Sequence, residues 1–105
     1  MPLLIKIQPS KNKAKKHNAL FRLEDNKFKT VSFGDANSQD YLEHRDLSRR
    51  ASYLKRHLKD LRTKDPLRPG FLAYYVGWSG FEQPKKPTVS IPKLIKLYNA
   101  KFFKH

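Results

Sequence analysis

Three side chains near the middle of the chain are of the types that cleave phosphodiesters. His44 and Asp46 are separated by one residue, and His57 follows thirteen residues after His44. An imidazole exchanges protons near neutral pH and a carboxylate can orient it, so this set fits a small nuclease. The spacing matches no paired metal-ligand motif, however, and the chain has no cysteine to complete a zinc site. We therefore predict no catalytic residue, no metal site and no cofactor, and retain a nuclease as the second alternative function.

Two arginines in the same region are better suited to binding than to catalysis. Arg49 and Arg56 are seven residues apart, which is two turns of an α-helix. A guanidinium group is a planar fork of N–H donors that fits a phosphate or a carboxylate with two hydrogen bonds. We predict that both arginines bind an anionic partner. Asp60 and Asp40 are the alternative, internal partners for Arg56.

Tyr53 and His57 lie one helical turn apart and allow two interpretations. In the first, Tyr53 stacks on or bonds to a phosphate-bearing ligand, and His57 donates a hydrogen bond to it. In the second, the two rings bridge the helix to the preceding hairpin, with the apolar ring buried and the polar tip in water. We favour the second interpretation and keep phosphate contact as the alternative.

The net charge gives the broadest indication of a partner. The 105 residues contain 23 Lys and Arg against 9 Asp and Glu, a formal charge of +14. So basic a chain repels itself unless a polyanion such as nucleic acid is near. The excess is spread over the whole chain, which suits charge neutralisation better than the reading of base edges. The predicted nucleic-acid or anion-binding residues are Lys13, Lys15, Lys16, Arg45, Arg49, Arg56, Lys59, Lys85 and Lys86.

A small α+β domain is predicted to position these residues. Residues 1–18 are predicted to be a basic N-terminal arm with a candidate short strand at 3–7, because a stretch within it carries four lysines and no acid. Residues 19–105 are predicted to form a single domain. It begins with a β-hairpin of strands 19–24 and 28–33, since apolar and polar residues alternate on both sides of an Asp-Asn turn. The candidate strand at 3–7 would make the sheet three-stranded.

The hairpin is predicted to pack against a long amphipathic helix and a C-terminal helix. The long helix is predicted to begin after Asp46 as its N-cap, because apolar residues then recur at intervals of three and four. A short helical turn at residues 41–44 is predicted before it, capped by Ser38 or Asp40. Residues 71–78 are the most apolar run, and we predict a short buried helix there, with a strand as the alternative. The apolar face predicted for the long helix consists of Leu47, Ala51, Leu54, Leu58 and Leu61.

The C-terminal helix is predicted to begin after Ser90 as its N-cap. Pro92 then falls in the first turn, where the N–H that proline lacks would have no partner within the helix. Lys101 and Lys104 follow near the end, where a positive charge interacts favourably with the helix dipole. The predicted apolar stripe of this helix consists of Ile91, Leu94, Ile95, Tyr98 and Phe102.

Several motifs taken together resemble a small uncharacterised family found in nucleocytoplasmic large DNA viruses and some large phages. The motifs are FG, then DYxxHxD, then RxxxYxxRH, then GFL and a tryptophan. The resemblance covers the chain from Ala19 to Trp78. It departs in three places. Ala36–Gln39 replaces the Gly-Tyr-Ser that usually precedes Asp-Tyr, Gly77 replaces a large aliphatic residue, and the link after the long helix is short. The residues that carry the resemblance are Phe33, Gly34, Asp40, Tyr41, His44, Asp46, Arg49, Tyr53, Arg56, His57, Gly70, Phe71, Leu72 and Trp78.

The resemblance implies a setting and no reaction. We predict a small basic structural protein of a large DNA virus particle, not an enzyme, as either a minor capsid protein or a DNA-associated core component. Its predicted partners are viral capsid or core proteins and the phosphate backbone of DNA, bound without sequence preference. Its predicted location is the virion, and the host cytoplasm or nucleus during assembly. The first alternative is a non-specific nucleic-acid-binding accessory protein in viral replication or transcription. No window is apolar enough to predict a membrane span.

Overall fold

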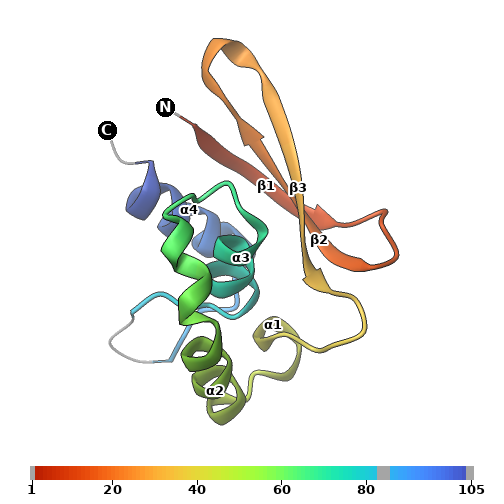
Figure 1. The fold of residues 1–105 in the computed structure, drawn as a ribbon, viewed down its shortest axis with the longest axis vertical. Helices are drawn as coiled ribbons and strands as arrows, with labels where there is room; N and C mark the ends of the chain where they lie inside the picture. The colour runs from red at the N-terminus through yellow and green to blue at the C-terminus, as the bar shows by residue number, and fades with distance from the viewer. Residues whose placement is uncertain (1, 83–85, 104–105) are drawn as a thin grey trace.

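The computed structural model describes residues 2–82 and 86–103, and it confirms the α+β fold class. An antiparallel sheet in the order β1-β2-β3 comes first in the chain, and the helices that follow gather on one side of it (Figure 1). The strands are β1 (Leu3–Pro9), β2 (Lys15–Arg22) and β3 (Phe28–Asp35). The α-helices are α1 (Tyr41–His44), α2 (Leu47–His57), α3 (Pro69–Leu72) and α4 (Ile91–Phe102). Two 3₁₀ helices are η1 (Glu24–Asn26) and η2 (Leu58–Thr63), and one π-helical segment is η3 (Ala73–Gly77).

The lysine-rich N-terminal segment belongs to the sheet. The structure places the predicted boundary at residue 18 inside β2, so residues 1–18 are not a separate arm. In the pairing of β2 with β3, His17 lies opposite Phe33 and Ala19 opposite Val31. The lysines at the start of β2 do not prevent this pairing: Lys15 is exposed and lies opposite Asp35, and Lys16 contacts the carbonyl of Ser38 and the carboxylate of Glu43. Lysine content therefore gave a poor indication of order at this place.

The tip of the hairpin between β2 and β3 lies where the sequence predicted a turn. It contains η1, in which Asp25 and Asn26 adopt left-handed backbone conformations, with φ of 61° and 58°. Asp and Asn tolerate this region better than other non-glycine residues, because their short polar side chains can bond to the local backbone. The choice of residues at the tip thus permits the sharp reversal.

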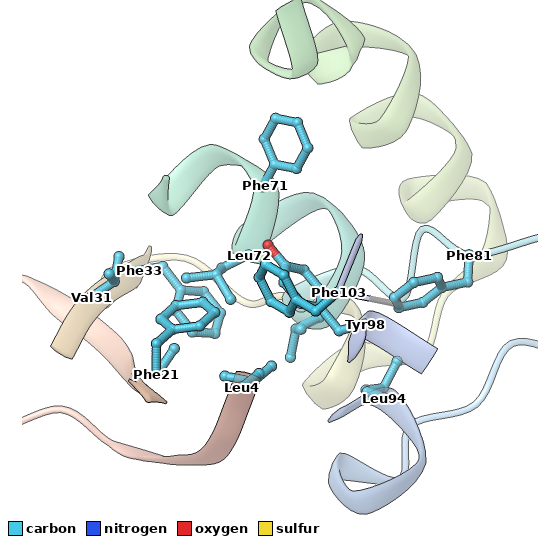
Figure 2. Packing of buried hydrophobic residues seen from close by; sticks show 12 residues of the cluster. Leu4, Phe21, Val31, Phe33, Phe71, Leu72, Phe81, Leu94, Tyr98 and Phe103 are labelled. Carbon is cyan, nitrogen blue, oxygen red and sulfur yellow. The ribbon is translucent and has the colours of Figure 1, made fainter. Parts of the chain in front are cut away.

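A single core joins the sheet to the C-terminal helices. Elements α3, η3 and α4 contact the sheet, whereas α2 lies farther from it (Figure 1). Figure 2 shows Phe21 and Phe33 of the sheet facing Leu72 of α3, with Tyr98 of α4 beyond them. The Tyr98 hydroxyl donates to the carbonyl of Pro66, and burial raises the pKa of Tyr98 above its ordinary value. The buried core residues are Leu4, Ala19, Phe21, Val31, Phe33, Phe71, Leu72, Val76, Phe81, Leu94, Tyr98 and Phe103.

The apolar run at residues 71–78 is helical, as predicted. The α-helix α3 continues directly into η3, whose hydrogen bonds span five residues. The chain then turns sharply at Gly80, whose N–H donates to the carbonyl of Tyr74 at 3.0 Å. A Cβ added at Gly80 would lie 2.6 Å from that carbonyl oxygen, which no side chain can tolerate. The turn therefore requires glycine.

The C-terminal helix α4 confirms its predicted cap and its predicted stripe. The Ser90 hydroxyl accepts the N–H of Lys93, and the apolar side chains of the stripe are buried or packed against the core. Asn99 adds a contact that the sequence did not indicate. Its side-chain oxygen accepts the N–H of Leu4 at 2.8 Å, and its side-chain nitrogen donates to the carbonyl of Leu4 at 3.0 Å. This side chain thereby occupies the free edge of β1 as a neighbouring strand would.

The predicted packing face of α2 is wrong by about a quarter of a turn, at 100° per residue. The side chains of α2 with specific contacts outside the helix include Arg50 with Ser79, Tyr53 with Trp78 and His57 with Asp60. Leu47 and Leu58, expected to be buried, are 54% and 57% exposed. The cause is that the polar and aromatic side chains find specific partners, described below, which the leucines do not. Within residues 2–82 and 86–103, no helix is long and apolar enough to cross a bilayer.

Candidate functional site

A cavity of about 600 Å³ lies between α2, the end of β3 and η3. Its first wall is α2, which contributes Arg49, Tyr53 and Arg56. Its second wall is the segment from Gly34 to Asp40, and its third is the end of η3 with Trp78. Cavities of this size are typical of sites for small ligands or for single groups of a larger ligand. Segments that are far apart in the sequence thus converge on one hollow.

The two arginines of the first wall have no internal partner. Asp46 begins α2 as predicted, since its Oδ1 accepts the N–H groups of Ser48 at 2.9 Å and Arg49 at 3.1 Å. From that start, Arg49 and Arg56 fall on the same side of the helix, both exposed and both lining the cavity. Neither guanidinium group forms a hydrogen bond or an ion pair with another residue in the described part of the chain. The hydroxyls of Ser48 and Ser52 line the same wall.

Arg50, the residue between these positions, has the opposite role and holds α2 in place. Its Nη2 donates to the carbonyl of Ser79 at 2.8 Å and to that of Phe81 at 3.4 Å. Its Nε lies 3.2 Å from the carbonyls of both Trp78 and Ser79. The guanidinium group also lies 5.8 Å from the ring centroid of Tyr41. Arg50 therefore fixes the rotation of α2 about its axis and presents Arg49 and Arg56 to the cavity.

A stack of three rings supports the same orientation. The ring of Tyr53 lies parallel to that of Trp78 with the centroids 4.0 Å apart, and His57 covers the other face of Tyr53 at 4.1 Å. The Nδ1 of His57 lies 2.9 Å from a carboxylate oxygen of Asp60. Burial, with Asp60 as a lesser cause, raises the pKa of Tyr53 to about 12, so its hydroxyl is neutral at physiological pH. Because both faces of Tyr53 are covered, a ligand base cannot stack on it.

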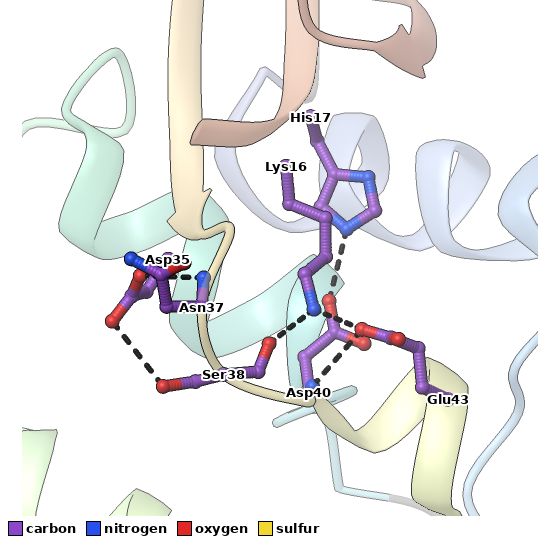
Figure 3. Close-up of polar contacts among 7 residues, drawn as sticks. All are labelled: Lys16, His17, Asp35, Asn37, Ser38, Asp40 and Glu43. Carbon is purple, nitrogen blue, oxygen red and sulfur yellow. Dashed lines mark hydrogen bonds and ion pairs between the residues drawn. The ribbon is translucent and has the colours of Figure 1, made fainter. Parts of the chain in front are cut away.

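Beside the second wall lie Lys16 and two acids, Asp35 and Glu43. Gly34 has a φ of 82°, a conformation that favours glycine, and it turns the chain out of β3. Lys16 of β2 donates to the carbonyl of Ser38 and pairs with the carboxylate of Glu43, as Figure 3 shows. The loop is closed by Asp35, whose carboxylate accepts the Asn37 N–H at 2.9 Å. The charge of Lys16, predicted to be available to an anion, is thus balanced within the domain.

Asp40 is the buried acid of the site. Its Oδ2 accepts from the Nε2 of His17 at 2.9 Å (Figure 3). It stands at the N-cap of α1 and forms a capping box with Glu43, whose side chain accepts the Asp40 N–H at 3.4 Å. Its Oδ1 is buried and has no hydrogen-bond partner in residues 2–82 and 86–103. Asp40 therefore joins β2 to α1 and does not pair with Arg56, the alternative that the sequence left open.

His44 and Asp46, two members of the nuclease hypothesis, have structural roles. The Nδ1 of His44 accepts the backbone N–H of Asp46 at 2.9 Å, which places the proton of a neutral His44 on Nε2. The ring lies 5.0 Å from that of Trp78 and edge-on to that of Tyr41. Burial, and then the charge of Arg49, lower the pKa of His44 below its ordinary value. Within the described residues, no three His, Cys, Asp or Glu side chains cluster as metal ligands.

The structure brings some of the predicted anion-binding residues together and separates others. Arg45 ends α1 in a left-handed conformation and is exposed, as is Lys59 in η2. Lys86 lines a second hollow on the far side of α2, and Lys85 lies outside the described residues. Lys13 and Lys15 are exposed at the turn between β1 and β2 and at the start of β2. The predicted residues that line the cavity are Lys16, Arg49, Tyr53, Arg56 and His57.

The interpretation that Tyr53 and His57 bridge the helix to the hairpin gave them the wrong partners. Tyr53 packs α2 against Trp78, whereas His57 covers the other face of Tyr53 and contacts Asp60 of η2. Sequence reasoning did not assign Ser48 and Ser52 to the site. Their spacing of four residues, beside Arg49, would have placed them on one side of the helix with it.

The fold and the cavity define a small basic α+β protein with an arginine-lined hollow beside its central helix. The chain belongs to a family of unknown function (DUF5754), whose sequence model matches residues 5–57. The matched segment runs from β1 to the end of α2, so it contains two of the three walls of the cavity. No curated protein and no solved structure matches the chain.

Proposed function

We propose that the protein is a small structural component of a large DNA virus particle that binds nucleic acid through phosphate groups, without reading sequence. The observation that carries the proposal is the pair Arg49 and Arg56, two exposed guanidinium groups on one side of α2 that have no hydrogen bond or ion pair with any described residue. Two turns of helix separate them by about 10 Å along the axis. A guanidinium group is well suited to a phosphate, since it can donate two parallel hydrogen bonds.

The use of the acidic residues supports an external anion. Six of the nine acids already contact described residues, and most of these contacts are to backbone N–H groups, hydroxyls or histidines. Lys16 and Arg68 are basic residues that do pair with acids, namely Glu43 and Asp65. The large excess of positive charge therefore stays on the surface, where it attracts a polyanion. The six acids are Asp35, Asp40, Glu43, Asp46, Asp60 and Asp65.

The covered faces of the ring stack favour phosphate contact over base reading. A protein that recognises single-stranded nucleic acid commonly offers open aromatic faces for the bases. Here Trp78 and His57 cover both faces of Tyr53. The arginines and hydroxyls of the cavity are donors suited to phosphate oxygens, which carry no sequence information. The virion setting is part of the proposal and rests on the sequence resemblance.

The salt dependence of DNA binding tests the proposal. Anisotropy of a labelled mixed-sequence duplex would be measured with the full chain between about 50 and 200 mM salt. Arg49→Gln with Arg56→Gln is compared with a control that removes two exposed charges of α4, Lys93→Gln with Lys96→Gln. Because each lost phosphate contact reduces the slope of log K against log salt by about 0.9, the arginine variant should lose about 2 from the slope.

Two outcomes would overturn the phosphate site. In the first, wild-type binding is absent or insensitive to salt, which leaves no role for phosphate. In the second, the α4 control loses as much affinity as the arginine variant, so that charge alone and not the cavity governs binding. The virion setting is tested separately by whether the protein is recovered from purified particles. Recovery in equal amounts with the major capsid protein after DNA is digested would favour a minor capsid role.

A further inference from the structure

On the side that faces away from the cavity, α2 and the first residue of η2 carry an apolar strip that the described residues leave partly uncovered. Leu47 is 54% exposed and Leu58 is 57% exposed. Ala51 lies between them and is exposed, and Leu54 is half-buried. At 100° per residue this strip is about half a turn from Arg49 and therefore on the opposite side of the helix. We call these four residues the leucine strip.

The spacing of the leucine strip is that of a helix-pairing seam. Successive members are separated by four, three and four residues, which is the alternation of the a and d positions of a heptad. The strip spans twelve residues and is about 16 Å long. A second helix laid along it would remove the exposed surface of Leu47 and Leu58 from water.

A hollow beside the strip enlarges the surface that a second helix would contact. Its volume is about 890 Å³, and Leu47 and Leu54 form one side of it. The other side is formed by Tyr74, Phe81 and Pro87, which follow the end of α2 by seventeen residues or more. The apolar surface is therefore wider than one helix face.

The charges around the strip indicate what kind of helix fits. Lys55 and Arg62 are exposed and occupy positions next to the seam, where heptad helices carry the charges that choose a partner. Lys86 lines the hollow, together with a single acid, Glu82. A second copy of this chain would place these basic side chains opposite the same basic side chains, and two molecules of formal charge +14 repel each other. A helix with acidic residues beside its apolar stripe would meet them with opposite charge.

We propose that the leucine strip docks an amphipathic helix with acidic flanks from a partner protein. This goes beyond phosphate binding and does not depend on it, because the two surfaces lie on opposite sides of α2. A protein with both surfaces can hold nucleic acid on one side and an acidic protein on the other. The chain would then connect the two.

A designed peptide tests the proposal directly. The probe is a labelled helical peptide of about 14 residues, with Leu at the a and d positions and Glu at the e and g positions. The control peptide has the same composition in an order that breaks the spacing, so its charge is equal. Anisotropy at about 0.15 M salt, where surface charges are screened beyond about 8 Å, separates docking from general attraction.

Two double variants of matched hydrophobicity assign the binding to the strip. Leu47→Ser with Leu58→Ser should weaken binding of the heptad peptide at least tenfold and leave DNA affinity unchanged. Ile5→Ser with Leu97→Ser removes two other exposed apolar side chains, 41% and 37% exposed, and should bind as wild type. If the leucine variant fails to fold, Ala51→Glu replaces it, since glutamate suits an exposed helical position and repels the acidic peptide.

Three results would overturn the proposal. Equal binding of the ordered and reordered peptides would mean that charge alone attracts them. Equal loss in both double variants would mean that the strip has no special role. A wild-type dimer in sedimentation that the leucine variant abolishes would make a second copy the occupant. DNA binding that fails while the peptide still binds would reject the phosphate proposal and leave this one intact.

Discussion

Exchanging each of two neighbouring arginines for lysine should lower stability at Arg50 and leave it nearly unchanged at Arg49. Arg50→Lys keeps the net charge but removes the planar fork that donates to the carbonyls of Trp78, Ser79 and Phe81. Arg49→Lys keeps the same charge one residue earlier, where the side chain forms no hydrogen bond or ion pair with the described residues. The pair therefore separates geometry from charge.

The size of the effect follows from the contacts that are lost. Hydrogen bonds to a charged group contribute about 1.5–3 kcal/mol each, and a lysine ammonium can replace part of the fork but not all of it. We expect Arg50→Lys to lower the free energy of unfolding by about 2 kcal/mol. For a domain of this size that corresponds to a fall in Tm of about 8–16 °C. Arg49→Lys should change stability by less than about 0.5 kcal/mol.

Thermal and urea denaturation of the two variants measure this difference. The m-values should agree with wild type, so that the shift in midpoint reports stability and not a change in the unfolded state. If Arg50→Lys were as stable as Arg49→Lys, the claim that the guanidinium group anchors α2 would be false. The orientation of Arg49 and Arg56 toward the cavity would then need another cause.

Three further perturbations test other contacts. The folded-state pKa of His44 is lowered, so the stability that its neutral form contributes is fully present above the unfolded pKa of 6.5 and is lost as pH falls from there through the folded pKa, by at most about 1.4 kcal/mol per pH unit. In denaturation between pH 7 and 5, His44→Gln should therefore lose less stability than wild type. An equal loss of stability in the two proteins would contradict this. Tyr53→Phe should keep the ring stacked on Trp78 and should melt at the wild-type temperature. Tyr53→Ala should lower the free energy of unfolding by about 2–3 kcal/mol. Equal losses of stability in the two variants would show that the stack is unimportant. Asn99→Leu should lower the free energy of unfolding by about 2 kcal/mol and speed hydrogen exchange at the Leu4 amide, because the N–H and C=O of Leu4 lose their partners. A Leu4 amide that stays protected in this variant would count against the contact.

The parts of the fold that depend on local signals were predictable. Asp46 and Ser90 begin their helices because a side-chain oxygen can reach the N–H groups of the next turn, which is a matter of a few residues. The Asp25-Asn26 tip follows from the tolerance of these residues for left-handed backbone. The strand at Lys15 was missed because its pairing is with β3, which is not a property of the lysines themselves.

The cavity was predictable in one wall only. Arg49 and Arg56 could be placed on one side of a helix from their spacing alone. The opposite wall depends on the register of β2 with β3, which brings Lys16 within reach of Glu43 and His17 within reach of Asp40. The packing of Arg50 depends on carbonyls almost thirty residues away, and no local pattern encodes it. The leucine spacing indicated a packing face, but nothing in it could say that Leu47 and Leu58 stay exposed in the part of the domain that the structure describes.

The two hydrogen bonds between the Asn99 side chain and the backbone of Leu4 have a consequence for the order in which the chain can fold. The two residues are 95 apart in sequence, so this edge of β1 stays uncovered until 95 further residues have been made after Leu4. At synthesis rates of about 5–20 residues per second, that interval lasts roughly 5–20 s. An uncovered strand edge is a template on which another nascent chain can add a strand. Slow synthesis or crowded polysomes should therefore favour aggregation of this protein through β1. The exposure of this edge ends when the Asn99 side chain binds the N–H and C=O of Leu4.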